Sequence, residues 1–315
     1  MSETVTGTLR GRDVLSIADL EPGELRALLR LALRLKAEGH GQPLQGRTLA
    51  LLFEKPSLRT RLSFEVAMRS LGGHCLYFSP QEVGLGVREP VRDVARVLER
   101  HVDCVAVRTF QQEKVEEMAR YASVPVINAL SDHEHPTQAM ADLLTVLEAK
   151  GKLEEVVLAF VGDGNNVARS LCLGAAMCGV HFRIASPEGY RLPADLVERA
   201  RALAAQSGGS VALLDSPREA VAGADVVYTD VWTSMGQEGE AEARRRAFAG
   251  YTVNEGLLSL ARPDAIFMHD LPAHRGEEVT DAVIEGPQSV VWQQAENKTH
   301  AVKALLLALL AGEGG

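Results

Sequence analysis

Short apolar runs alternate along the chain with longer stretches in which apolar residues recur at helical spacing. The short runs predict strands at Thr48–Phe53, Cys75–Phe78, Cys104–Val107, Val124–Asn128, Val156–Val161, Phe182–Ala185, Val226–Thr229, Ala265–Met268 and Val290–Trp292. The longer stretches predict helices at Arg59–Leu71, Val91–Arg100, Lys114–Tyr121, Thr137–Ala149, Val167–Cys178, Pro193–Ala205, Glu255–Leu260 and Asn297–Leu310. Residues 13–38 show the same helical spacing, with a helix start at Glu21-Pro22-Gly23-Glu24.

Strands that alternate with helices predict the α/β class, with two doubly wound parallel-sheet domains, helices on both faces of each sheet, and helices linking the domains. A boundary near Lys150-Gly151-Lys152 divides the strands into two sets of normal sheet size. We therefore expect a first domain over residues 1–150 and a second over 151–295. Residues 296–315 are expected to form a C-terminal helix that packs back on the first domain.

The composition indicates the general class of protein but not the reaction or ligand. The chain has 315 residues, of which 46% are hydrophobic and 24% charged, as in soluble globular proteins. Its net charge of −9 argues against nucleic acids or membrane surfaces as partners. The four cysteines form no CxxC pair, and no leader or membrane-spanning run is evident, so we expect free thiols and a cytoplasmic location.

The segment from Phe53 to Glu65 carries the strongest local signal. A buried strand leads into a polar, cationic turn in which Ser57 is a good helix N-cap. Helix N-termini offer N–H donors and the positive end of a dipole, and Arg59, Thr60 and Arg61 add to them. The segment therefore favours binding of a small dianion such as phosphate, although a capped helix with surface arginines has the same pattern.

Polar clusters follow six of the nine predicted strands. Ligands of open α/β sheets bind beyond the carboxyl ends of the strands, so this distribution favours an enzyme. The clusters are Lys55–Arg61, Arg108-Thr109, His133–Gln138, Gly162–Asn166, Asp230–Gly236 and His269–Pro272.

Several of these clusters allow a second interpretation. His133 and His135 suggest a metal, but no third ligand of suitable type lies nearby in the sequence, so we predict no metal. Val167 occupies the place of the third glycine in a GxGxxG motif, so a dinucleotide is weakly supported. Trp232 and Met235 are as readily packing residues as ligand contacts. The turn at Ser234–Gly236 and the charged run Gln237–Arg246 favour a mobile lid.

Together these residues resemble the aspartate/ornithine carbamoyltransferases over nearly the whole chain. Ser57-Leu-Arg59-Thr60-Arg61 and His135-Pro-Thr-Gln138 look like the carbamoyl-phosphate site shared by that superfamily. Asp230-x-Trp-x-Ser234-Met235-Gly236 and the loop His269-Asp270-Leu271-Pro272 look like its ornithine branch. The resemblance implies trimers with active sites at subunit interfaces, carbamoyl phosphate binding first, and no cofactor.

The same resemblance assigns roles to individual residues. Carbamoyl phosphate would be bound by Ser57, Leu58, Arg59, Thr60, Arg108, His135, Gln138, Asp270, Leu271 and Lys298. Ornithine would be bound by Asn166, Asp230, Ser234 and Met235. Arg108, His135 and Asp270 are the candidate catalytic residues, with His135 polarising the carbamoyl oxygen.

The implied reaction is transfer of the carbamoyl group from carbamoyl phosphate to the δ-amine of L-ornithine, giving L-citrulline and phosphate. It would serve arginine biosynthesis or citrulline breakdown. Two alternatives remain open: a carbamoyltransferase for another amine, such as acetylornithine or putrescine, and a non-catalytic regulatory protein that binds carbamoyl phosphate.

A few positions depart from the family pattern. Asp270 stands where the loop usually has cysteine, and Lys298 stands where arginine is usual. Gly84 aligns with a glutamine that the family lends to a neighbouring subunit's site; either Gln81 replaces that contact or the contact is absent. Leu58 replaces a frequent threonine, a milder change because backbone N–H groups bind much of the phosphate.

Overall fold

Two parallel sheets organise the chain in the computed structural model, which describes residues 9–39 and 41–311. Each sheet belongs to a separate unit of the chain. The first unit extends to Leu144 and resumes at Glu296, and the second unit is Thr145–Ala295. Both divisions fall inside a helix, α7 (Pro136–Lys150) and α14 (Val291–Leu310), so helices make both covalent links between the units.

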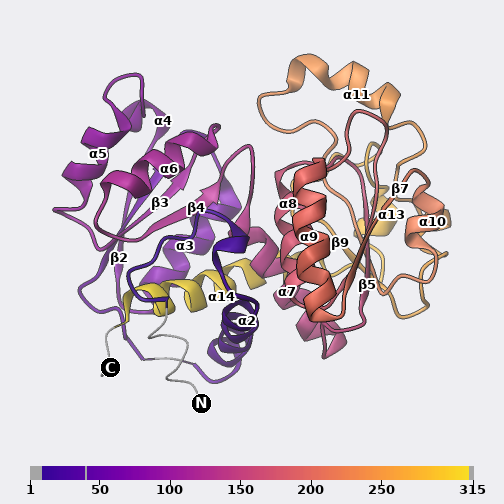
Figure 1. Ribbon diagram of the computed structural model, residues 1–315, viewed down its shortest axis with the longest axis horizontal. Coiled ribbons are helices and arrows are strands. Elements are labelled where there is room, and N and C mark those ends of the chain that lie inside the picture. Colours follow the sequence, from indigo (N-terminus) through magenta and orange to yellow (C-terminus); the bar gives the residue numbers. More distant parts are fainter. Residues whose placement is uncertain (1–8, 40, 312–315) are drawn as a thin grey trace. The chain divides into compact units, whose positions relative to one another are not determined.

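The first unit is built on a four-stranded sheet with the order β2-β1-β3-β4. Its strands are β1 (Thr48–Phe53), β2 (His74–Phe78), β3 (Cys104–Arg108) and β4 (Val126–Leu130), all parallel. Its other elements are η1 (Ile17–Asp19), α2 (Pro22–Ala37), α3 (Leu58–Ser70), α4 (Pro80–Val83), α5 (Val91–Leu98) and α6 (Gln112–Tyr121). Helices α5 and α6 bury apolar side chains against one face of the sheet, while α3 and part of α14 lie on the other face (Figure 1).

The second unit is built on a five-stranded sheet with the order β7-β6-β5-β8-β9. Its strands are β5 (Val157–Val161), β6 (His181–Ala185), β7 (Ser210–Leu214), β8 (Val226–Tyr228) and β9 (Ile266–Met268), again parallel. Its helices are α8 (Asn166–Met177), α9 (Ala194–Ser207), α10 (Pro217–Val221), η2 (Glu238–Glu240), α11 (Ala241–Ala247), α12 (Glu255–Leu258) and α13 (Asp281–Ile284). Helices α8 and α9 cover one face, and α10, α12 and α13 pack their apolar residues against the other (Figure 1).

Each sheet has a point at which the strand order reverses. In the first unit the reversal lies between β1 and β3, and in the second it lies between β5 and β8. Ligands of doubly wound sheets bind at such switch points, in the crevice beyond the carboxyl ends of the strands. We therefore expect ligands to bind near the segments that follow β1, β3, β5 and β8.

The two parallel α/β sheets confirm the predicted fold class, but two predicted elements are wrong. Val290–Trp292 is not a strand, because α14 begins at Val291, six residues before its predicted start. Buried polar side chains at Gln294, Asn297 and Lys298 interrupt the apolar stripe of this helix. The hydrophobic pattern therefore did not predict its first turns. The edge strand β7 was missed; unlike β5 and β8, it is only partly buried. Residues 13–16 are also not helical, and Val14 forms a bridge with Ile127.

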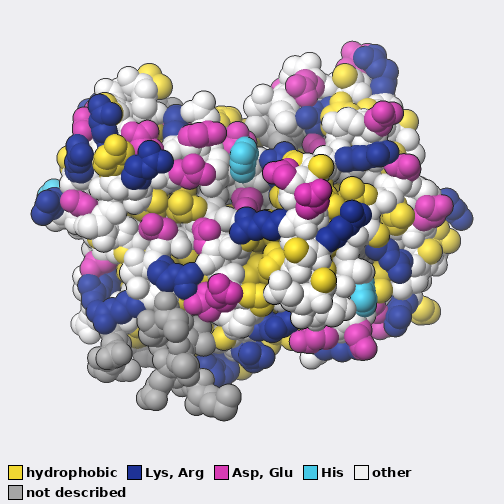
Figure 2. All heavy atoms as spheres, viewed as in Figure 1, with side chains coloured by type: hydrophobic (Ala, Val, Ile, Leu, Met, Phe, Trp, Pro, Cys, Tyr) yellow, Lys and Arg dark blue, Asp and Glu magenta, His cyan; other side chains and the backbone are white. Residues whose placement is uncertain are grey.

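The surface mixes charges of both signs. On the face drawn in Figure 2, Lys and Arg side chains lie among Asp and Glu side chains. None of the helices that the structure describes is long and apolar enough to cross a membrane.

Candidate active site

The N-terminus of α3 lies directly beyond β1 and forms the cationic turn predicted from the sequence. Ser57 has extended backbone angles, and its hydroxyl accepts a hydrogen bond from the Thr60 amide at 3.2 Å, as a helix N-cap should. The Leu58 side chain is 75% exposed, which leaves its backbone N–H as the group this residue can offer an anion. Arg59 lies in the same turn and is half-buried.

Arg61 is directed elsewhere. Its guanidinium pairs with Glu65 at 2.8 Å and lies over the Tyr77 ring, 3.6 Å from the ring centroid. Both contacts tie the side chain to its own helix and to the edge strand β2. The predicted contribution of Arg61 to the anion pocket is therefore not supported by its position.

Two cationic side chains from other elements lie within hydrogen-bond distance of the Thr60 hydroxyl. Lys298, on α14, donates to Thr60 Oγ1 at 3.0 Å, and Arg108, at the end of β3, lies 3.5 Å from the same oxygen. Lys298 Nζ also lies 2.9 Å from His135 Nε2, at the start of α7. Four predicted carbamoyl-phosphate residues that are distant in sequence thus meet within the first unit.

His135 is almost fully buried inside this cluster. Burial lowers the pKa of His135 well below its usual range, and the positive charges of Lys298 and Arg108 lower it further. The imidazole is consequently neutral at physiological pH.

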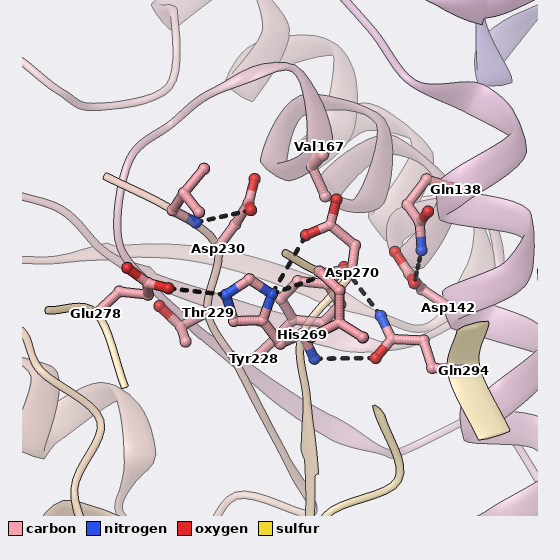
Figure 3. A network of polar contacts seen from close by, with 12 residues as sticks. Gln138, Asp142, Val167, Tyr228, Thr229, Asp230, His269, Asp270, Glu278 and Gln294 are labelled. Carbon is pink, nitrogen blue, oxygen red and sulfur yellow. Dashed lines mark hydrogen bonds and ion pairs between the residues drawn. The ribbon is translucent and has the colours of Figure 1, made fainter. Parts of the chain in front are cut away.

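The turn before α7 is held by side chains that do not belong to the candidate site. Ser131 Oγ accepts hydrogen bonds from the amides of His133 and Glu134, and the Glu134 carboxylate accepts a hydrogen bond from Ser16 Oγ at 2.5 Å. Gln138, one turn into the helix, is buried and donates to Asp142 at 2.8 Å (Figure 3). His133 is exposed, so it and His135 occupy different environments.

In the second unit, Asp230 follows β8 at the switch point beside β5. Asn165, the N-cap of α8, donates from Nδ2 to Asp230 Oδ2 at 2.6 Å, and the Val231 amide donates to the other carboxylate oxygen at 2.7 Å. Asn166 is the first residue of α8. Sequence reasoning chose Asn166 as the ligand, whereas Asn165 is the residue that orients Asp230.

The loop after β9 is held by a buried histidine and a buried glutamate (Figure 3). His269 Nδ1 accepts a hydrogen bond from the Leu271 amide at 2.9 Å, while Nε2 lies 3.2 Å from Glu278. Glu278 also accepts a hydrogen bond from the His274 amide at 2.5 Å. These contacts support Leu271 in a left-handed conformation, with φ of 60°, that is uncommon for a residue other than glycine.

Asp270 adds a second carboxyl group beside Asp230. Burial raises the pKa of Asp230 well above its usual range, and the negative charge of Asp270 and a hydrogen bond to it raise it further. The carboxyl groups of both residues and His269 could surround a metal ion, with candidate ligand atoms all within 4.8 Å of one another. Because Leu271 and Glu278 already engage both ring nitrogens of His269, the donor set fits a metal poorly.

The segment after Asp230 is anchored by an arginine that sequence reasoning missed. Arg244, on α11, pairs with Asp163 at 2.7 Å and donates to the Trp232 carbonyl at 2.9 Å, and its side chain is only 8% exposed. Asp163 belongs to the loop after β5, so Arg244 joins the loops that follow β5 and β8. Ser234 and Met235 lie along the chain between Asp230 and α11. Ser234 is half-buried, and Met235 is 47% exposed. The only sequence signal for Arg244 was the charged run that suggested a lid.

Two family models match the chain in succession. Residues 12–148 match the carbamoyl-P binding domain of aspartate/ornithine carbamoyltransferase, and residues 154–309 match the Asp/Orn binding domain. The chain belongs to the aspartate/ornithine carbamoyltransferase family.

Individual members of the family are similar over their full length. The ornithine carbamoyltransferase of Bacillus subtilis is 53% identical over 308 residues, covering 98% of this chain and 97% of that protein. The crystal structure of the Thermus thermophilus enzyme has a TM-score of 0.87 at 50% identity, covering 95% of this chain and 98% of that one. The ornithine carbamoyltransferase structure from Pyrococcus furiosus has a TM-score of 0.93 at 50% identity, covering 96% and 98%.

The positions that depart from the family pattern have clear local settings. Lys298 is buried among Thr60 and His135, and Asp270 lies beside Asp230. Gly84 ends α4 in a left-handed conformation with φ of 48°, where an added Cβ would lie 2.9 Å from Arg88 Cβ. A glycine adopts this conformation without strain, and any larger residue here would require a shift of the Arg88 side chain.

Proposed function

We propose that the protein transfers the carbamoyl group of carbamoyl phosphate to the δ-amine of L-ornithine, giving L-citrulline and phosphate. The observation that supports this most directly is the assembly of Thr60, Arg108, His135 and Lys298 at the N-terminus of α3. It places cations and helix N–H groups in one buried position of the domain that matches the carbamoyl-phosphate-binding model.

The chemistry of the transfer suits this cluster. Attack of an amine on the carbamoyl carbon places negative charge on the carbamoyl oxygen and then on the departing phosphate. The N–H groups of Ser57, Leu58, Arg59 and Thr60 at the helix terminus would bind the phosphate, because helix N-termini attract anions. Arg108, His135 and Lys298 would surround the carbamoyl group, with Gln138 at its amino end.

The second unit supplies groups suited to an amino acid. A carboxylate at Asp230 matches the α-ammonium group of ornithine, and Asn166, Ser234 and Met235 would hold the rest of the α-carbon substituents. The δ-amine must lose a proton before it attacks, because an alkylamine has a pKa of about 10.4. Asp270 is the candidate proton acceptor.

We also propose a cytoplasmic homotrimer that acts in arginine metabolism. The family resemblance supports the trimer and the pathway, and the four free cysteines suit a reducing compartment such as the cytoplasm. Sedimentation equilibrium of the purified protein tests the assembly, and a monomer that is active at assay concentrations would refute it.

A single assay tests the function. Purified protein is mixed with carbamoyl phosphate and offered ornithine, acetylornithine or putrescine in separate reactions, and the carbamoylated product is measured. We expect product only with ornithine. Product with another amine would reassign the substrate, and no product with any amine despite tight binding of a phosphonate analogue would support a regulatory role. A variant with His135→Ala and Lys298→Ala is the control for contaminating activity.

A further inference from the structure

Glu54 connects the ends of the two strands that carry the anion turn and Arg108. It follows β1 directly and precedes Ser57 by three positions. Its amide donates a hydrogen bond to the Arg108 carbonyl at 2.8 Å, and its carboxylate accepts one from the hydroxyl of Thr109, a fully buried residue. The Thr109 amide in turn donates to the Leu130 carbonyl, at the end of β4, at 2.9 Å. Glu54 therefore fixes the ends of β1 and β3 relative to each other.

The charge of this carboxylate is balanced by a lysine from another element. Lys114 Nζ, on α6, lies 2.8 Å from Glu54 Oε1, whereas the Thr109 hydroxyl contacts Oε2. The side chains of Lys114 and Glu54 are only 19% and 13% exposed. A carboxylate so far withdrawn from water is costly unless a cation and hydrogen-bond donors satisfy it, and Glu54 has both.

The position of this ion pair matters because the neighbouring groups are suited to an anion. Glu54 is bonded through its amide to the residue that supplies the Arg108 guanidinium, and the helix N-terminus at Ser57 begins within the same turn of chain. A negative charge left unpaired at position 54 would repel a dianion bound there. Salt would screen that repulsion only weakly, because the carboxylate is mostly buried.

We propose that Glu54 is a positioning residue for the carbamoyl-phosphate site and that Lys114 cancels the charge with which this carboxylate would otherwise repel the substrate. The inference rests on the proposed function and adds two residues to it, neither of which is among the expected ligands. It differs from a purely structural ion pair in one consequence. Loss of Lys114 alone weakens anion binding, and removal of the Glu54 charge as well restores it.

Anion binding by neutral and charged variants tests the charge balance. The ligand is phosphonoacetamide, a stable analogue in which a methylene group replaces the bridging oxygen of carbamoyl phosphate, and its affinity is measured by calorimetry at constant ionic strength. We expect Lys114→Met to bind the analogue roughly tenfold more weakly than the wild type. The double variant Glu54→Gln/Lys114→Met should bind within about threefold of the wild type, since it carries no unpaired charge.

A second comparison isolates the positioning role of Glu54. Glu54→Ala/Lys114→Met has the same charge as Glu54→Gln/Lys114→Met but offers the Thr109 hydroxyl no acceptor. We expect it to bind the analogue more weakly than the glutamine variant. Arg47→Met is the matched control, because Arg47 pairs with Asp103 at 2.6 Å at the opposite ends of the same two strands. It removes one positive charge from the same sheet and should leave the affinity unchanged.

Several results would overturn the inference. If Lys114→Met binds as tightly as the wild type, or if the double glutamine variant binds as weakly as Lys114→Met, the lysine does not act by cancelling charge. Equal affinities in the alanine and glutamine double variants would refute the positioning role. Wild-type protein that binds neither the analogue nor inorganic phosphate would also overturn the inference. Wild-type protein that binds the analogue but forms no citrulline would refute the transfer reaction alone, and the charge balance would stand.

Discussion

Replacing Arg244 with methionine should destabilise the second unit and weaken ornithine binding. The side chains of Arg244 and Asp163 are only 8% and 12% exposed, so the variant leaves a buried carboxylate without its cation. Removing one partner of such a pair typically costs about 3–5 kcal/mol. The contact of Arg244 with Glu240 adds little, because the Glu240 side chain is 62% exposed.

The chain contains its own reporter for this test. It has two tryptophans, and Trp232 is buried and stacked on Phe248 with 5.4 Å between the ring centroids. In a Trp292→Phe background, urea unfolding followed by fluorescence therefore reports on the segment that Arg244 anchors. Arg245→Met is the matched control, because Arg245 is exposed and its loss should change stability by less than about 0.5 kcal/mol.

The pH dependence gives the reasoning a second check. Burial raises the pKa of Asp163, and the attraction of Arg244 opposes that rise, so removing the arginine should raise the pKa further. A carboxyl group whose pKa is higher in the folded than in the unfolded state binds protons more tightly when folded, and stability then increases as pH falls. The Arg244→Met defect should therefore shrink between pH 8 and pH 5. Adding Asp163→Asn should recover part of the loss at pH 8.

The catalytic consequence should appear in one substrate only. We expect the KM for ornithine to rise roughly tenfold or more, equivalent to about 1.4 kcal/mol, because Arg244 joins the loops that follow β5 and β8. Affinity for carbamoyl phosphate, measured by calorimetry, should stay unchanged. Unfolding and kinetics indistinguishable from Arg245→Met would refute this account of the anchor.

Three other substitutions test separate features. Asp270→Asn removes the negative charge that raises the pKa of Asp230. The acidic limb of the pH profile of kcat/KM for ornithine should therefore move to lower pH. An unchanged profile would show that the Asp270 side chain takes no part in the chemistry. Ser57→Ala should cost about 1 kcal/mol of stability and weaken carbamoyl-phosphate binding, whereas Ser216→Ala, at the cap of α10, should cost stability alone; equal affinities in the two variants would contradict the anion site. Gly164→Ala would place a Cβ 2.6 Å from a backbone nitrogen, so we expect a lower thermal midpoint, and a midpoint equal to the wild type would show that the loop yields without cost.

The parallel α/β architecture could be predicted because short apolar runs alternate along the chain with stretches of helical spacing. This alternation remains recognisable even when single elements are assigned wrongly. The wrong strand at Val290–Trp292 came from reading two β-branched residues and an aromatic residue without knowing that the next turns bury polar groups. Gln294, Asn297 and Lys298 are all almost fully buried, and each is held by side-chain or backbone hydrogen bonds. The local hydrophobic pattern cannot predict that a polar side chain is buried when its hydrogen-bond partners are distant in sequence.

The candidate site shows the same limit. The turn at Ser57 could be predicted from local capping chemistry, and Asp230 and Asp270 from their places after strands. The contact between Lys298 and His135 joins residues 163 positions apart, and that between Arg244 and Asp163 joins residues 81 positions apart. Neither contact could be inferred from local sequence, so the Lys298–His135 contact and the anchoring role of Arg244 were found only in the structure.

The division of the chain inside α7 and α14 has a consequence for synthesis on the ribosome. Translation runs from the N-terminus to the C-terminus at about 5–20 residues per second, so all of Thr145–Ala295 is synthesised before Glu296 is added. The first unit must then wait for its last segment, in which Leu309 accepts a hydrogen bond from the Gly11 amide and Lys298 meets Thr60. A nascent chain stalled at Ala295 would contain the anion turn and His135 but not Lys298, so the carbamoyl-phosphate cluster can be completed only after the whole second unit has been synthesised.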